Sequence, residues 1–305
     1  MNKEKILYII SENNDFLDDS IFSGLRNFCD YYDIYYLIPN NISAIERYNR
    51  TKYRYKEDLL KSFNTINIFD KSLMYDYCIV GQIWESNLLL YKEIKDKILK
   101  KTIFIDGMDI PKYNIGIKAD YVFRRETLED ESFLPFCCPN DLLNMHTDSI
   151  DFFINFQMGP SSEKRIDLYR YVKNNIPLNN SLVYDLIGNS NYFSKMNEWW
   201  ENISKTKIIF SDVGGGKDCY RFWEGIATGN YVISRKIDLY NKIKFPENVI
   251  FFDNYNEIKN IVNKIILVED CDIIKNRNNI KKILKNSQST YNRAEKIINK
   301  IKEWR

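Results

Sequence analysis

Apolar residues along the chain fall into short continuous runs, separated by longer stretches in which they recur every three or four positions. Strands that alternate with helices in this way predict βαβ units and a parallel sheet, and continuous apolar runs are typical of strands covered on both faces. In the first part of the chain we expect strands at residues 5–11, 34–38, 65–69, 77–81 and 102–106, and helices at 19–32, 56–62 and 86–100.

A second alternation follows a stretch of turns and prolines that ends near residue 144. Its expected strands are 152–156, 182–187, 207–211, 231–234 and 249–252, and its expected helices are 163–174, 194–203, 219–228 and 255–267. The pattern predicts an α/β fold of two facing Rossmann-like domains, 1–146 and 147–285, with a C-terminal helix at 286–305 that packs back towards the first domain. Because ligands in such sheets bind outside the carboxyl ends of the strands, we expect the site in the cleft between the domains.

Composition narrows the class of protein. The 305 residues include 44 Lys and Arg against 42 Asp and Glu, which argues against a nucleic-acid coat protein or a membrane-surface protein. No run reaches the roughly 18 apolar residues of a membrane-spanning helix. None of the six cysteines forms a C-x-x-C pair and there is one histidine, so we expect no zinc site and a cytoplasmic protein with reduced, mostly buried thiols.

The C-terminal residues 271–305 are basic, with ten Lys or Arg and three Asp or Glu. We interpret this charge as the solvated face of one or two helices. The alternative is a peripheral contact with anionic lipid or nucleic acid.

Residues 207–236 carry the clearest chemical signal in the chain. A predicted strand runs into Gly214, Gly215 and Gly216, and the helix that follows ends at Gly229, a suitable C′ residue. Glycines let backbone N–H groups approach a ligand, and a helix N-terminus carries partial positive charge that suits phosphate. The spacing is neither a Walker loop nor a G-x-G-x-x-G fingerprint.

Charged side chains follow this glycine turn. Lys217 and Asp218 lie in the turn, and Arg221 and Glu224 lie three residues apart on one face of the predicted helix. A cation for phosphate and a carboxylate for ribose hydroxyls suit a nucleoside diphosphate. The alternative is a flexible loop beside an Arg–Glu surface pair.

At these residues the chain resembles a known family. Residues 218–229, DCYRFWEGIATG, resemble the donor-binding segment of GT-B glycosyltransferases, closest to the exostosin-like or group 1 branch of bacterial or phage enzymes. Further segments match that branch in the expected order: IDGMD at 105–109, YVFRRE at 121–126, LPF at 134–136 and YNRA at 291–294. The resemblance implies an acceptor-side first domain and a nucleotide-sugar-binding second domain.

The same resemblance implies transfer of a sugar from a nucleotide-sugar donor, with a UDP-sugar favoured, and without a metal or another cofactor. Many retaining members carry a glutamate eight residues before the second one, whereas this chain has Gly216 there, so the stereochemistry stays open.

Three further positions are candidates for donor binding. In two-domain transferases of this type the loop 159–165 brings a basic residue towards the phosphates, so we include Lys164 and Arg165, with ordinary solvated charges as the alternative. Tyr192 is placed to contact the nucleobase. We interpret the Trp199–Trp200 pair as core packing rather than as a stacking platform.

An inverting reaction also needs a general base from the first domain. We favour Asp109 and Asp106, which follow a predicted strand, with Arg221 stabilising the leaving group. Asp15, Asp18 and Asp19 follow the first strand on the same edge of the sheet. The alternative is that these aspartates cap turns and helices.

The leading hypothesis is a glycosyltransferase that acts on a hydroxyl of a glycan, a lipid-linked glycan or a protein. A second hypothesis keeps the transfer but makes a modified DNA base the acceptor, as in phage enzymes. The third is a non-catalytic protein that binds sugar nucleotides.

Overall fold

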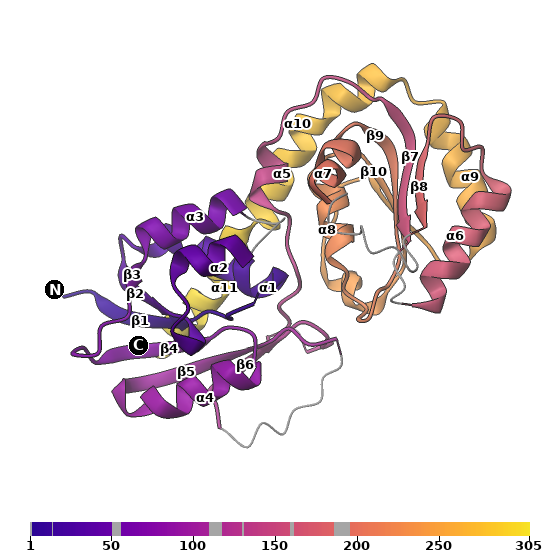
Figure 1. Cartoon of the computed structure of the whole chain (residues 1–305). Coiled ribbons are helices and arrows are strands. Elements are labelled where there is room, and N and C mark those ends of the chain that lie inside the picture. The colour runs from indigo at the N-terminus through magenta and orange to yellow at the C-terminus, as the bar shows by residue number, and fades with distance from the viewer. Residues whose placement is uncertain are drawn as a thin grey trace. The chain divides into compact units, whose positions relative to one another are not determined.

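The computed structural model describes residues 2–13, 15–50, 56–109, 118–129, 131–158, 162–185 and 196–305. The chain forms two compact units, each built on its own parallel sheet (Figure 1). Unit 1 contains Met1–Cys137 and Gln288–Arg305, and unit 2 contains Cys138–Ser287. The predicted α/β class is therefore confirmed. The first unit ends earlier than residue 146, and the assignment of acceptor and donor to the two units stays a prediction.

The sheet of unit 1 has six parallel strands in the order β3-β2-β1-β4-β5-β6. They are β1 (Glu4–Ile9), β2 (Tyr32–Leu37), β3 (Asn67–Ile68), β4 (Tyr75–Val80), β5 (Ile98–Asp106) and β6 (Tyr121–Arg124). The strand predicted at 65–69 is only two residues long, and β5 begins inside the stretch 86–100 predicted as helix. A 3-10 turn, η3 (Lys95–Lys97), ends the helix there and starts the strand.

Helices cover both faces of this sheet. They are α1 (Phe16–Leu25), α2 (Ala44–Arg50), α3 (Lys56–Thr65), α4 (Glu85–Ile94) and α11 (Thr290–Lys302), with short 3-10 turns η1 (Arg26–Phe28) and η2 (Pro39–Asn41). Figure 1 shows α4 on one face and the other helices opposite. Leu7 of β1 packs with Tyr91 of α4, whereas the ring of Tyr8 lies 5.7 Å from that of Phe22 in α1. Neighbouring residues of β1 thus face different helices, which explains its continuous apolar run.

Unit 2 has five parallel strands in the order β11-β10-β9-β7-β8. They are β7 (Phe152–Met158), β8 (Leu182–Asp185), β9 (Thr206–Ser211), β10 (Tyr231–Arg235) and β11 (Val249–Phe252). The helices are α5 (Asn140–Asn144), α6 (Glu163–Asn175), α7 (Met196–Ser204), α8 (Tyr220–Ala227), α9 (Tyr255–Ile266) and α10 (Asp270–Ser287), with the 3-10 turn η4 (Asp238–Lys242).

The two faces of the unit 2 sheet are covered by different helices. Leu168 of α6 and Val262 of α9 pack on one face with Phe156 of β7, and α7 and α8 cover the other face (Figure 1). Helix α8 ends as predicted, because Gly229 adopts a left-handed φ of 78° as its C′ residue.

Four of the ten C-terminal cations bind backbone carbonyl oxygens. In unit 1, Arg293 Nε donates to the Pro135 oxygen at 2.9 Å and Lys296 Nζ to the Phe133 oxygen at 2.7 Å. In unit 2, Arg277 Nη1 donates to the Thr147 oxygen at 3.0 Å and Lys281 Nζ to the Leu142 oxygen at 3.2 Å.

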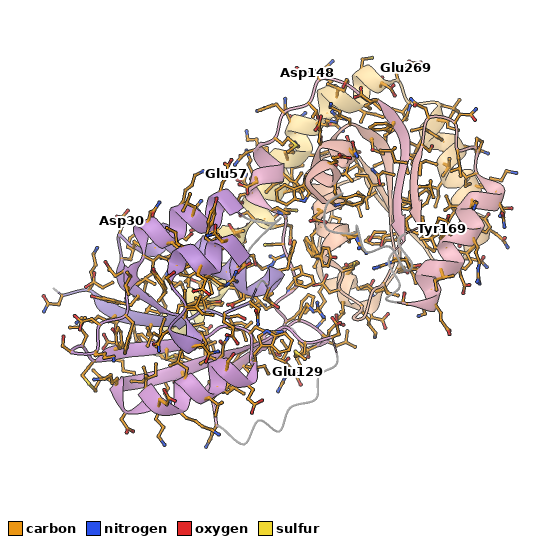
Figure 2. All side chains as sticks on the ribbon, viewed as in Figure 1. Asp30, Glu57, Glu129, Asp148, Tyr169 and Glu269 are labelled. Carbon is orange, nitrogen blue, oxygen red and sulfur yellow. The ribbon has the colours of Figure 1, made fainter. Side chains whose placement is uncertain are left out.

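The prediction of a uniformly solvated basic face is therefore wrong at these four positions. Burial lowers the pKa of Lys281 to about 8. Figure 2 shows solvated charges elsewhere, for example Asp30 and Glu57 at the rim of unit 1, and both of these residues are exposed.

The pair α1 and α11 crosses at a glycine. A Cβ atom at Gly24 would lie 2.2 Å from the carbonyl oxygen of Thr290 and 2.8 Å from the Cβ of Ala294. Ala294 is fully buried, so the short side chains at both positions let the two helices approach each other.

Gly24→Ala should therefore destabilise the protein by about 1–3 kcal/mol, because the added methyl group pushes against backbone that has no room to move. The free energy of unfolding in urea measures this loss. Gly225→Ala in α8 is the matched control, since its Cβ would meet methyl groups of Ile209 and Val232 at 3.3 Å. We expect that variant to change stability by less than about 1 kcal/mol. Equal losses in both variants would contradict the role of the α1–α11 crossing.

Candidate functional site

The carboxyl end of the unit 2 sheet is organised around Asp212, directly after β9. Its carboxylate is buried and accepts hydrogen bonds from Arg235 Nε at 3.0 Å and from Arg235 Nη2 at 3.1 Å. The same carboxylate accepts from the backbone N–H of Val213 at 2.7 Å. Two-point binding of this kind fixes the direction of the carboxylate as well as its place, so the start of the glycine turn is held firmly.

Arg235 is itself held by aromatic side chains. Its guanidinium lies 5.0 Å from the ring centroid of Tyr255 and 5.2 Å from that of Phe252, and it donates to the Tyr255 hydroxyl at 2.6 Å. The Tyr255 hydroxyl in turn donates to the carbonyl oxygen of Lys164 at 3.2 Å. The end of β10 is thereby linked to the start of α6.

Arg165 joins α6 to the start of α8. The residue is buried, and Nη2 donates to the carbonyl oxygen of Asp212 at 3.0 Å and to Cys219 Sγ at 3.2 Å. Cys219 is the N-cap residue of α8. Ser162, the N-cap of α6, donates to the carbonyl oxygen of Val213 at 2.8 Å. A guanidinium and a helix N-terminus therefore meet at this edge, and both favour an anion. Lys164, by contrast, is exposed.

The glycine turn closes on itself. The N–H of Gly214 donates to the carbonyl oxygen of Gly216 at 3.0 Å, so this amide is already used within the turn. Gly216 is buried, whereas Gly215 and Lys217 are exposed. Of the predicted phosphate-binding amides, that of Gly214 would have to exchange its partner to serve a ligand. Lys217 lies at the surface of the turn, where its long side chain carries a solvated positive charge.

Asp218 points into unit 2. It is buried, and its Oδ1 accepts from the Trp223 indole N–H at 2.7 Å and from the Tyr240 hydroxyl at 3.2 Å. Burial, with the Asp218 charge, raises the pKa of the Tyr240 hydroxyl, which therefore stays protonated as a donor. Arg221 is 8% exposed, and its guanidinium lies 5.5 Å from the ring centroid of Tyr220.

Glu224 is fully buried. Its Oε2 accepts from the Trp199 indole N–H at 3.1 Å, and its Oε1 accepts from the Trp200 indole N–H at 2.9 Å. Core packing was predicted for both tryptophans; Trp199 is buried and Trp200 half-buried, and both also donate hydrogen bonds. Both carboxylate oxygens of Glu224 already accept hydrogen bonds inside unit 2, and ribose binding by this residue stays a prediction. Tyr192 and residues 159–161 lie outside the described residues.

The carboxyl edge of the unit 1 sheet gathers aspartates. Asp106 ends β5 and is 5% exposed, its Oδ1 accepts from the Met108 N–H at 3.2 Å, and burial raises its pKa. Asp109 has an exposed carboxylate that forms an ion pair with the buried Arg125. Arg125 also lies 3.5 Å from Glu126. Of the two aspartates favoured as the general base, Asp106 has the raised pKa, and Asp109 has the carboxylate that is exposed to solvent.

The first strand leads into a second group of buried acids. Asp18 accepts from the Tyr8 hydroxyl and, at 2.6 Å, from the N–H of Ser11. Asp19 forms a buried ion pair with Arg47, whose Nε donates to the carbonyl oxygen of Ser11 at 2.6 Å. The peptide groups of Ser11 are therefore bound from both sides. This arrangement supports the interpretation of Asp18 and Asp19 as local structural acids.

Sequence reasoning missed Asp212, Arg235 and Tyr255. A signal for the first two was present, because Asp212 follows β9 and Arg235 ends the neighbouring strand β10. The carboxyl ends of adjacent parallel strands lie side by side, so an acid and a base at those two positions are expected to meet. Nothing in the sequence indicates Tyr255, which comes from a helix later in the chain.

Two features are absent from the described part of the chain. No three His, Cys, Asp or Glu side chains there are grouped as metal ligands would be. No helix there is long and apolar enough to cross a membrane.

The buried acids of unit 1 predict a pH dependence. Burial, with Asp15 and Asp19 nearby, raises the pKa of Asp18 to about 8, and burial raises that of Asp19 to about 7. The folded chain therefore holds these protons more tightly than the unfolded chain. The resulting stabilisation is complete below the ordinary pKa of 3.8 and is lost as the pH rises through 7 and 8.

We expect the free energy of unfolding in urea to fall as the pH rises from about 5 to about 8.5. Asp18→Asn should flatten that slope, while Asp30→Asn, an exposed control, should leave it unchanged. An unchanged slope in Asp18→Asn would contradict the assignment.

The Asp212–Arg235 pair predicts an asymmetry in stability. Arg235→Ala leaves a buried carboxylate without its cation and should cost about 3–5 kcal/mol, whereas Asp212→Asn leaves an arginine that reaches solvent and should cost on the order of 1 kcal/mol. Urea unfolding of the two variants measures the difference. Equal costs would show that the pair is not buried as described.

Comparisons with known proteins come from solved structures. No protein-family model and no curated protein sequence matches the chain. HepE of Anabaena, solved with UDP and glucose, matches with a TM-score of 0.60 and 11% identity over 98% of this chain and 100% of that chain. A glycosyltransferase of Rickettsia africae matches with a TM-score of 0.61 and 11% identity over 99% of each chain.

A third structure broadens this comparison. A protein of Listeria monocytogenes described as a putative UDP-N-acetylglucosamine 2-epimerase matches with a TM-score of 0.51 and 10% identity, over 99% of this chain and 96% of that chain. The matches cover both units. Because the sequence identity is low, they show similarity of fold alone. The chain has the GT-B fold, with two Rossmann-like units and a C-terminal helix that belongs to the first of them.

Proposed function

We propose that this protein is a nucleotide-sugar-dependent glycosyltransferase that binds its donor at the carboxyl edge of the unit 2 sheet. One observation carries the proposal: the buried guanidinium of Arg165 contacts Cys219, the N-cap of α8, beside the glycine turn. The GT-B fold supports it, since HepE of that fold was solved with UDP-glucose. We favour a UDP-sugar donor and an acceptor hydroxyl on a glycan, a lipid-linked glycan or a protein.

The reaction requires that the leaving diphosphate be stabilised. Negative charge develops on that group as the bond to the sugar breaks, and preorganised donors aimed at this charge lower the barrier. Arg165 and the N-terminus of α8 are held in place before a ligand arrives, which lowers the cost of binding. Arg221, the second residue of α8, and Lys217 of the glycine turn add further positive charge. Asp109 and Asp106 remain the proposed general base.

The direct test is a thermal-shift panel of UDP-, GDP-, CMP- and TDP-linked sugars, because a ligand that binds the folded chain raises its melting temperature. A shift with UDP-sugars supports the proposal. Donor hydrolysis and transfer assays then separate an enzyme from a non-catalytic binding protein. Duplex DNA carrying a modified base belongs among the acceptors, and binding of DNA that weakens with salt would favour the DNA hypothesis.

Arg221→Ala should lower kcat as well as donor affinity, because its contact with the diphosphate strengthens in the transition state. Losing one such contact costs about 10²–10³ in rate. Glu224→Gln should mainly raise KM if ribose binds there. Steady-state kinetics measures both, with Lys217→Ala as a milder control. Wild-type turnover in folded Arg221→Ala and Glu224→Gln would place the donor site elsewhere.

Metal independence is also a prediction of this proposal. Activity should survive EDTA, because the leaving group is stabilised by cationic side chains and a helix N-terminus. Activity that disappears with EDTA and returns with Mn²⁺ would contradict it.

A further inference from the structure

A groove in unit 1 lies between the edge strand β6 and helix α11. Its volume is about 610 Å³, within the range of small-molecule sites. Among the described residues, β6 is the last strand on its side of the sheet. The lining residues come from β6, from Glu131 and from one side of α11 and its end.

The α11 wall is a single polar stripe. Asn292, Lys296, Asn299 and Glu303 recur every three or four residues and therefore share one side of the helix. The apolar residues of α11, such as Ile297, are buried and lie outside this stripe. The stripe is thus not a by-product of core packing. It presents amide, carboxylate and ammonium groups on a rigid helix.

Two ammonium groups of the wall are held in fixed positions. Lys296 Nζ donates to the Phe133 carbonyl oxygen at 2.7 Å. Lys300 Nζ lies 4.3 Å from the ring centroid of Tyr121 and donates to Glu303 Oε2 at 2.7 Å. Side chains that are already ordered lose little freedom when a ligand binds. The half-buried ring of Tyr121 adds an apolar surface beside them.

The charged residues that line the groove indicate which class of ligand it binds. Three carboxylates, Glu131, Glu295 and Glu303, face two lysines, so the groove does not attract a polyanion. Two aromatic rings give too little apolar surface for a lipid tail, and Phe123 is 1% exposed. A ligand with many hydroxyls suits this lining, because each hydroxyl both donates to a carboxylate and accepts from an amide or ammonium group.

We propose that this groove is an oligosaccharide subsite that holds the neutral glycan chain of the acceptor. It belongs to unit 1, whereas the proposed donor residues belong to unit 2. The inference rests on the proposed glycosyltransferase function for the nature of the acceptor. Its contacts involve none of the donor-site residues, so the two can be tested separately.

The test uses the whole chain without donor. Cellotriose, maltotriose and chitotriose are the neutral probes, and a sulfated heparin tetrasaccharide is the anionic probe, with binding followed by saturation-transfer NMR and titration. We expect a neutral probe to bind, and Tyr121→Ala and Lys300→Gln each to weaken binding by about tenfold. Tyr121→Phe should retain most of the binding, because it keeps the ring.

Lys92→Gln is the matched control, since Lys92 is an exposed lysine of α4 in the same unit and lies outside the groove. It should bind the neutral probe as the wild-type chain does. Failure of every neutral probe to bind, equal binding by all variants, or binding of the sulfated probe alone would overturn the subsite. Melting temperatures of the variants establish that each is folded.

UDP-glucose binding is measured on the same samples. A chain that binds UDP-glucose but no neutral oligosaccharide overturns the subsite and leaves the proposed function standing. A chain that binds the oligosaccharide through Tyr121 and Lys300 but no sugar nucleotide supports the groove as a glycan site and contradicts the glycosyltransferase function.

Discussion

Backbone carbonyls of residues 133–149 are bound by cations from the two C-terminal helices, and both units depend on this constraint. Arg293 and Lys296 of α11 hold residues 133–136 in unit 1, and Arg277 and Lys281 of α10 hold residues 142–149 in unit 2. Apart from the short helix α5, this segment is irregular, so most of its carbonyl groups have no partner in a strand or helix, and a buried carbonyl without a partner is costly. Cations on two regular helices bind these carbonyl groups. Those of α11 bind residues of unit 1, and the last helix belongs to that unit.

The same contacts give a structural explanation for part of the family resemblance. The segments 134–136 and 291–294 are two separate parts of that resemblance, and in the structure the Arg293 side chain binds the backbone of the first segment. Their residues are explained by folding. The motif 218–229 is likewise partly structural, because Asp218 and Glu224 accept from indole N–H groups inside unit 2. Such a motif therefore contains residues that stabilise the fold around a site as well as residues suited to its chemistry.

At the carboxyl edge of the unit 2 sheet, the residues that hold the structure together come from separate parts of the chain. Asp212 follows β9, Arg235 ends β10, and Arg165 lies in α6, yet the three are linked by direct hydrogen bonds. Each alone is an ordinary charged residue. Together they hold the peptide groups before the glycine turn, which leaves Gly215 and Lys217 exposed beside the start of α8.

The sequence by itself determined the alternation of strands and helices, the parallel sheets, and the end of α8 at Gly229. These follow from local periodicity and from one backbone conformation that glycine adopts easily. It also placed Arg221 and Glu224 on one helix. Only the tertiary structure decided that Glu224 faces two tryptophans, that Arg165 reaches Cys219, and that cations of the last helices face inward. Such pairings join residues far apart in the chain, and periodicity carries no information about which distant groups will meet.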